Sequence, residues 1–408
     1  MKTNPFYDPY RVLTKVYADG AHLKIALSET DLEELNRART VKTVYGVLEN
    51  DGYLSLCIKT FAPKSPKQAA RILLKIALYQ LIFLEKPRYM VTDTAVDLCK
   101  RLGKGGMAGF LNAFLRAFDK EKVVLPQGDE GLSLKSNFPL FAVRKVKAQY
   151  GERAESILTA KSRGVTVRFV RGEEKYLTRP HLKTPFEKTY IFQNFTRDEG
   201  FFAGDYTFQS VGSIAICHAV EPCEEFLDAC AAPGGKSVLL AEKCKRVTAC
   251  ELHSHRVELI KSYCSRMGAE NVLPMQADSR EFRPEWEEKF DGVLCDVPCS
   301  GLGTAAENPD LPLRKTEEEF KELQKTQFEI LQTCARYVKK GGAITYSTCS
   351  ILREENDGIV ARFLKENEGF FCEQINSPLA HEKTAYGLQF LPDEAFGAGF
   401  YVSKLRRA

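Results

Sequence analysis

The 408-residue chain lacks any apolar run near the roughly 18 uncharged residues that a membrane-spanning helix requires. The longest candidate, residues 72–84, is interrupted by Lys75 and Gln80. The first twelve residues also lack the apolar stretch of a secretory signal. We therefore expect a cytoplasmic protein that neither crosses nor enters a membrane.

The sequence also lacks a Cys-x-x-Cys pair, although it contains 13 cysteines. Zinc ligands of the finger or ribbon type are thus absent, and no metal site is predicted. An odd number of cysteines in a long chain favours free thiols in a reducing compartment over a disulfide scaffold. Eleven of them lie between Cys217 and Cys372, where most are expected to be small buried apolar residues.

Acidic residues are comparatively scarce at the amino-terminal end of the chain. Residues 1–122 contain 20 Lys and Arg against 13 Asp and Glu, whereas the remainder has 38 against 41. A basic part joined to a mildly acidic part suggests contact with a polyanion. On charge alone, an ordinary solvated surface is an equally good interpretation.

The hydrophobic pattern predicts a multidomain protein, which we expect to be a monomer. Residues 1–125 show only helical periodicity, residues 126–132 have the composition of a linker, and residues 133–203 combine helix with short strands. From residue 204 to 408, strands alternate with amphipathic helices. That alternation is typical of an α/β Rossmann-like domain, in which a ligand binds at the carboxyl ends of parallel strands.

A motif rich in alanine and glycine, DACAAPGGK at residues 228–236, follows the first strand of this last domain. Two glycines after a strand let the backbone turn tightly and let a ligand approach closely. The motif matches neither the G-x-G-x-x-G dinucleotide loop nor the G-x-x-x-x-G-K-[ST] phosphate loop. By itself it indicates a ligand loop and a plain tight turn about equally.

Three acids, Glu251, Asp278 and Asp296, come at the ends of the next three predicted strands. A glutamate there can accept both hydroxyl groups of a ribose, an aspartate can accept an adenine amino hydrogen, and acids suit a cationic sulfonium. One such acid is more often a cap or turn residue. Three at corresponding positions favour a nucleoside ligand.

Two cysteines, Cys299 and Cys349, lie just beyond neighbouring strands in turns rich in Ser, Gly and Pro, where functional residues concentrate. By contrast Cys217, Cys250, Cys295 and Cys334 each stand inside an apolar stretch and are expected to be buried. A Cys/His protease dyad is the alternative interpretation. The histidines nearest to this edge, at positions 253 and 255, are poorly placed for it.

Several of these motifs resemble known families. DACAAPGGK, DVPCSGLG and TYSTCS, in this order, resemble the Nop/Sun-type family of S-adenosylmethionine-dependent RNA cytosine-C5 methyltransferases. Residues 43–48, 77–84 and 109–116 (TVYGVL, ALYQLIFL and GFLNAFLR) are similar to the NusB-like domain. The combination is typical of the bacterial members that act on small-subunit (16S) ribosomal RNA.

The resemblance implies an all-α NusB-like RNA-binding domain, a small α+β subdomain and a C-terminal α/β Rossmann-like methyltransferase domain. It also implies formation of 5-methylcytosine in 16S ribosomal RNA, with S-adenosyl-L-methionine as cofactor and no DNA partner. Cys349 is then the nucleophile that adds to cytosine C6, Cys299 assists release, and Asp296 binds the cytosine edge. The implied cofactor-binding residues are Cys230, Ala231, Ala232, Pro233, Gly234, Gly235, Lys236, Glu251, Asp278 and Asp296.

The chain departs from the family pattern at a few positions. Ala306 and Glu307 replace a basic pair, Ser210 replaces an aspartate, and Val297 replaces an alanine. None of these changes touches the thiols or the strand-end acids, so they bear on substrate contacts and not on reaction type. The alternatives are the same chemistry on transfer RNA and a non-catalytic RNA-binding or ribosome assembly factor.

Overall fold

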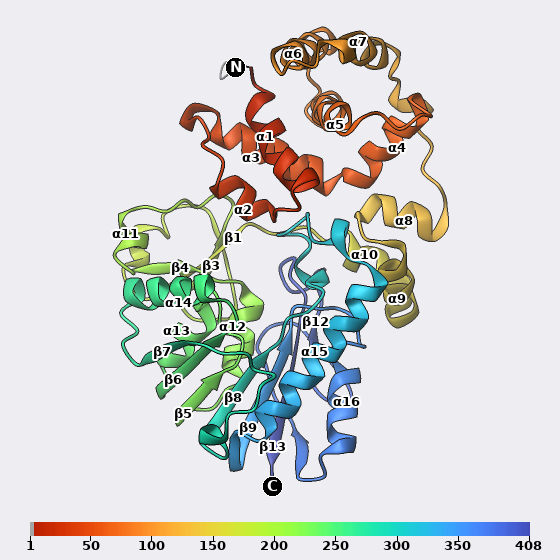
Figure 1. The fold of residues 1–408 in the computed structure, drawn as a ribbon. Helices are drawn as coiled ribbons and strands as arrows, with labels where there is room; N and C mark the ends of the chain where they lie inside the picture. Colours follow the sequence, from red (N-terminus) through yellow and green to blue (C-terminus); the bar gives the residue numbers. More distant parts are fainter. Residues whose placement is uncertain (1–3) are drawn as a thin grey trace. The chain divides into compact units, whose positions relative to one another are not determined.

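The structure, a computed structural model, describes residues 4–408 (Figure 1). They form two compact units. The first contains the chain up to Thr159 together with Asn308–Arg314, and the second contains Ala160–Glu307 and Lys315–Ala408. Within the described range, no helix has both the length and the apolarity that a membrane span requires.

The first unit is entirely helical, as the sequence pattern predicts. Its helices are α1 (Tyr7–Ala18), α2 (Leu23–Ser28), α3 (Glu34–Glu49), α4 (Asp51–Phe61), α5 (Gln68–Ile82), α6 (Arg88–Arg101), α7 (Ala108–Ala117), α8 (Gly128–Ser136), α9 (Leu140–Tyr150) and α10 (Ala154–Leu158). Helix α5 is central because it is apolar on nearly every face, and its residues from Ile72 to Gln80 are all buried. The one buried cation there, Lys75, forms an ion pair with Asp51 of α4.

The boundary between the expected domains differs from the sequence pattern. Residues 126–132, expected to be a linker, lie largely within helix α8, which packs against α4. Asn137 ends α8 in a left-handed conformation and bonds to the backbone of Leu48 and Gly52. These tertiary bonds order a segment whose composition is that of a loop. Helices α9 and α10 of the expected 133–203 subdomain therefore belong to the first unit, and its strands and helix α11 to the second.

The second unit begins with a small antiparallel sheet in the order β2-β3-β1-β4. The strands are β1 (Val165–Phe169), β2 (His181–Lys183), β3 (Thr189–Phe192) and β4 (Tyr206–Phe208), and helix α11 spans Glu199–Phe202. A cluster of aromatic rings that includes Phe169, Phe195 and Tyr206 fills one side of this sheet.

The remainder of the second unit is built on a nine-stranded sheet in the order β11-β12-β13-β9-β8-β5-β6-β7, with β10 paired to β13. Its strands are β5 (Cys223–Asp228), β6 (Cys244–Glu251), β7 (Val272–Gln276), β8 (Phe290–Asp296), β9 (Val338–Thr348), β10 (Phe370–Glu373), β11 (Glu382–Lys383), β12 (Leu388–Phe390) and β13 (Phe400–Arg407). Strands β5 to β9 are parallel, which confirms the predicted α/β domain.

Helices cover both faces of this sheet (Figure 1). They are α12 (Val211–His218), α13 (Gly235–Ala241), α14 (Ser254–Met267), α15 (Glu317–Ala335) and α16 (Asp357–Glu366). Helices α12, α13 and α14 contribute to one apolar core, and α15 and α16 to another. The chain changes direction between β5 and β8, and ligands of such sheets bind at the carboxyl ends of the strands beside that point.

Strand β5 ends on a fully buried carboxylate, Asp228. One of its oxygens accepts a hydrogen bond from Ser237 of α13 at 2.7 Å, while the other has no partner. Burial raises the pKa of Asp228 to about 6, because charge is costly where water is excluded. The carboxyl group therefore joins α13 to the sheet and stays protonated to higher pH than an exposed aspartate.

Gly46 tests the packing of α3 on α5. A Cβ at this position would lie 2.0 Å from the Tyr79 ring, so one of the two helices must shift. We expect Gly46→Ala to lower the free energy of unfolding by about 1–3 kcal/mol in urea titrations. Gly109→Ala on α7, where a Cβ meets no atom within 4 Å, should instead be neutral or stabilising by up to about 1 kcal/mol. Equal effects at both positions would contradict this account.

Asp228 predicts a pH dependence of stability. The unfolded chain ionises this group near its ordinary pKa of 3.8, whereas the folded protein holds the proton to about 6. The contribution of the protonated carboxyl to the free energy of unfolding is thus fully present below the unfolded-state pKa. It is lost as pH rises through the folded-state pKa. Relative to Asp228→Asn, the wild-type free energy of unfolding should fall by about 2 kcal/mol between about pH 4 and about pH 6.5. Urea unfolding at both pH values measures this, and parallel pH profiles would refute it.

Candidate active site

The two cysteines singled out from the sequence meet at the carboxyl ends of β8 and β9. These strands are parallel neighbours in register, with Asp296 opposite Ser347. The turns that follow them bring Cys299 Sγ to 2.9 Å from Cys349 Sγ, and the backbone N–H of Cys349 donates to Cys299 Sγ at 3.2 Å. Both are free thiols and half-buried. Two thiols from separate turns therefore face one another at an accessible edge of the sheet.

The pairing makes the two sulfur atoms electrostatically unequal. The hydrogen bond with Cys349 and burial raise the pKa of the Cys299 thiol well above its ordinary value, with a contribution from the nearby Glu355 carboxylate. A second negative charge 2.9 Å from the first is unfavourable in a site that excludes water. Cys299 thus keeps its proton when Cys349 is ionised.

A buried carboxylate that the sequence analysis missed holds the Cys299 turn. Glu355 is fully buried and accepts hydrogen bonds from the backbone N–H of Ser300 at 2.8 Å and from its hydroxyl at 2.6 Å. Gln327 of α15 donates to the same carboxylate at 2.9 Å and to the carbonyl of Pro298 at 3.0 Å. A buried charge must be satisfied in this way, so Glu355 constrains the turn. No pattern in ILREEND distinguishes it from an exposed acid.

A second buried polar group holds the Cys349 turn. The side-chain oxygen of Asn356 accepts from the Thr348 hydroxyl at 2.6 Å, and its amide donates to the carbonyl of Ser350 at 3.1 Å. Gln389 of β12 also donates to that carbonyl at 3.2 Å. Glu355 and Asn356 are adjacent in sequence, so one short segment before α16 positions both thiols.

Asp296, the third predicted catalytic residue, ends β8 beside the thiols. Its carboxylate forms an ion pair with Lys236 at 2.5 Å and accepts from the Ser347 hydroxyl at 2.7 Å. Burial alone would lower the pKa of Lys236, but the adjacent Asp296 raises it above its ordinary value. Lys236 is therefore a cation committed to Asp296. The structure thus brings Cys299, Cys349, Asp296 and Lys236 into one site.

The expected cofactor loop runs from the end of β5 into α13. Gly234 has φ of +106°, a conformation that favours glycine, and a Cβ there would lie 3.3 Å from Ile260. Gly235 begins α13 and has only the Tyr263 and Gln209 side chains within 4 Å of a Cβ. Gly234 therefore lets the loop of residues 230–236 pass close to α14 before the chain enters α13.

The two remaining acids lie at the ends of the neighbouring strands. Glu251 is 5% exposed, accepts from the His253 backbone N–H at 3.0 Å and pairs with Arg256 at 3.3 Å. Asp278 follows β7 and is bound by the guanidinium of Arg280, which holds the pKa of that carboxyl below its ordinary value. Both acids thus form ion pairs along this edge, and Arg280 is a partner that the sequence analysis missed.

The donor set matches a cationic nucleoside better than a pyrophosphate or a metal. Carboxylates predominate at this edge, and its half-buried cation, Lys236, is paired with Asp296. Among residues 4–408, no group of three His, Cys, Asp or Glu side chains could hold a metal ion.

His253 and His255 stack on each other beyond β6, away from a protease arrangement with either thiol. The four cysteines expected to be core residues, Cys217, Cys250, Cys295 and Cys334, are all buried.

Two family models match separate parts of the chain. One described as "16S rRNA methyltransferase RsmB/F" matches residues 215–406, and one described as "NusB family" matches residues 10–120. These matches confirm the NusB-like helical domain and the methyltransferase domain predicted from the motifs.

Individual proteins support the same assignment. The chain is 30% identical to a probable ribosomal RNA small subunit methyltransferase B of Bacillus subtilis, over 94% of each chain. It is 26% identical to ribosomal RNA small subunit methyltransferase B of Xanthomonas campestris, over 98% of this chain and 96% of that protein. A crystal structure of PH0851 has the same fold, with a TM-score of 0.85, 22% identity and coverage of 100% and 98%. The chain therefore belongs to the 16S rRNA methyltransferase RsmB/F family, whose methyl donor is S-adenosyl-L-methionine.

Proposed function

We propose that the protein forms 5-methylcytosine in small-subunit ribosomal RNA through a covalent bond between Cys349 and the target base. The observation that carries the proposal is the 2.9 Å approach of Cys349 and Cys299 beside Asp296. Relatives named ribosomal RNA small subunit methyltransferase B, which match this chain over nearly its whole length, support the choice of RNA.

Cytosine needs a nucleophilic catalyst because its C5 carbon is a poor nucleophile. The Cys349 thiolate adds to C6, forming an S–C6 bond and shifting the electron pair of the C5–C6 double bond so that C5 can react. Bound S-adenosyl-L-methionine supplies an electrophilic methyl group to that carbon. C5 then carries both a methyl group and a hydrogen, so one more step is required.

Cys299 takes part in that last step. Loss of the C5 proton returns its electron pair to the ring, the C5–C6 double bond re-forms, and the S–C6 bond breaks with Cys349 leaving as a thiolate. Cys299 is close enough to accept the proton or to position the base that does so. Because the pKa of the Cys299 thiol is raised, Cys299 must first lose its own proton to solvent before it can accept the C5 proton, and the thiolate so formed is a strong base.

Asp296 and Lys236 act on the same ring. The Asp296 carboxylate, fixed by Lys236 and Ser347, accepts a hydrogen bond from the cytosine amino group. The ammonium of Lys236 offsets negative charge that develops in the ring during addition. The target base must leave its stack to reach this edge, as in other enzymes that modify a base.

The cofactor contacts follow from the same edge of the sheet. Residues 230–236 would border the methionine part, Glu251 the ribose hydroxyls and Asp278 the adenine side, with Asp296 beside the methyl donor. Asp278 makes its contact while bound to Arg280, so one carboxylate oxygen must serve both partners. A non-catalytic assembly factor is disfavoured, because nothing but chemistry requires two buried hydrogen-bond networks to hold a pair of thiols.

Cys349→Ala tests the nucleophile. We expect methyl transfer to small-subunit ribosomal RNA to fall by at least about 10³-fold, because the ring is no longer activated. Affinity for S-adenosyl-L-methionine should stay within a few fold. Methyl incorporation and bisulfite mapping of the RNA measure the product, and calorimetry measures cofactor binding. Cys223→Ala, at the opposite end of β5, is the matched control. Normal turnover by Cys349→Ala would end the covalent proposal.

Cys299→Ala tests release separately. With Cys349 intact the S–C6 bond still forms, but the C5 proton leaves slowly, so a covalent protein–RNA complex should accumulate. It is expected as a slower band on denaturing electrophoresis that disappears after nuclease treatment. The double variant Cys299→Ala/Cys349→Ala should show no such band. If Cys299→Ala alone gives no adduct, Cys299 has no role in release.

A further inference from the structure

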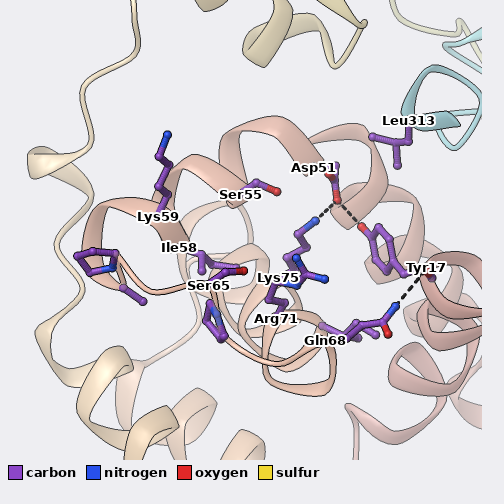
Figure 2. A pocket seen from close by; sticks show the side chains of 14 residues that line it. Tyr17, Asp51, Ser55, Ile58, Lys59, Ser65, Gln68, Arg71, Lys75 and Leu313 are labelled. Atoms are coloured by element: carbon purple, nitrogen blue, oxygen red, sulfur yellow. Dashed lines mark hydrogen bonds and ion pairs between the residues drawn. The ribbon is translucent and has the colours of Figure 1, made fainter. Parts of the chain in front are cut away.

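The helical unit contains a cavity that the proposed chemistry does not use. It has a volume of about 490 Å³ and lies where α4 turns into α5 (Figure 2). The residues that line it include Asp51 and Lys59 of helix α4 and Gln68 and Lys75 of helix α5. Tyr17 of α1 lines it as well. We call this region, residues 59–71 with the cavity beside it, the α4–α5 corner.

The α4–α5 corner is strongly basic. Residues 52–84 contain five cations, Lys59, Lys64, Lys67, Arg71 and Lys75, and no acid at all. The first four are exposed, and within residues 4–408 none of them has an ion-pair partner. Unpaired cations at the end of one helix, on the following turn and at the start of the next helix produce a local positive potential that attracts an anion.

The acid inside the cavity does not offset this charge. Asp51 is buried and paired with Lys75, and the Tyr17 hydroxyl donates to the same carboxylate (Figure 2). The Lys75 ammonium also lies 4.6 Å from the centre of the Tyr17 ring. Asp51 is therefore neutralised from within, and the cations at the rim remain available to a ligand.

Helix α5 also begins at this corner. It is 15 residues long, and no side chain caps its amino end. The free N–H groups and positive dipole end of such a helix favour an anion. A second hollow of about 680 Å³ lies on the other side of the same first turn and shares Gln68 and Ile72, with Lys67 and Lys104 at its border. An extended polyanion could follow both hollows across the turn.

We infer that the α4–α5 corner binds backbone phosphates of the RNA substrate. Arg71 and Lys59 contact one phosphate at the cavity rim, the amino end of α5 and Lys67 contact the next, and the apolar side chains of Ile58, Ile72 and Leu313 face the ribose between them. The inference rests on the proposed function for the identity of the polyanion. Contacts of this kind position RNA without reading its sequence.

The test is the salt dependence of RNA binding by the full chain. A fluorescent transcript of small-subunit ribosomal RNA is titrated at several KCl concentrations with wild type and with Lys59→Gln/Arg71→Gln. The double variant should bind several-fold more weakly, and the slope of log affinity against log salt should fall by roughly 1 to 2 because two phosphate contacts are lost. The control variant is Lys42→Gln/Lys100→Gln. It changes two exposed lysines of the same unit that do not line the cavity, and it should keep the wild-type slope. Ser65→Glu, an exposed change that places an acid at the rim, should weaken binding in the same way.

An unchanged slope in both rim variants overturns the inference. A free phosphate source is the other possibility, so inorganic phosphate and adenosine 5′-monophosphate are titrated as well. One outcome would assign the cavity to a small ligand and overturn the RNA assignment. In that outcome the wild type binds phosphate or the nucleotide at micromolar concentration, Lys59→Gln/Arg71→Gln abolishes this binding, and the salt slope of RNA binding is unchanged. If the rim variants show the predicted slope changes but the wild-type protein does not methylate the RNA, the proposed function is refuted and the RNA-binding surface is retained.

Discussion

The parallel pairing of β8 with β9 is the constraint on which the candidate site depends. Because Asp296 lies opposite Ser347, the turns after the two strands emerge side by side and their thiols approach to 2.9 Å. Strand pairing alone leaves turns free to move. Glu355 and Asn356 restrict the movement of the turns. Each of these side chains is buried, and its hydrogen-bond partners are groups of the turns beside it. Backbone pairing sets the distance, and buried polar groups hold it.

Charge along the same edge follows from what each acid contacts. Glu251 and Asp278 each have an arginine beside them, Asp296 has a half-buried lysine, and Asp228 behind them is buried without a cation in contact. Three of these carboxylates are therefore held in ion pairs, while burial raises the pKa of the fourth to about 6. Acids at the surface of the edge suit a cationic nucleoside, and the acid beneath them ties α13 to the sheet.

The helical unit differs from the second unit in the sign of its prominent charges, which are basic. The end of α4, the turn after it and the start of α5 concentrate unpaired cations around an uncapped helix end, and the acid in the adjacent cavity, Asp51, is neutralised by Lys75. In the second unit, the cations at the sheet edge, Lys236, Arg256 and Arg280, are each paired with a carboxylate. RNA methylation requires both properties, since the base must enter a site that favours a cationic donor while the phosphates need positive charge elsewhere.

The sequence by itself determined the helical and α/β parts, and it singled out the loop at residues 228–236 and the two thiols, because periodicity and short motifs are local properties of the chain. It could not identify Glu355, Asn356 or Arg280, whose roles depend on partners distant in sequence or, for Arg280, on the fold of a short turn. It also misjudged residues 126–132, since α8 is ordered by contacts with α4. Only the tertiary structure decided these points, because burial and pairing turn ordinary polar residues into constraints.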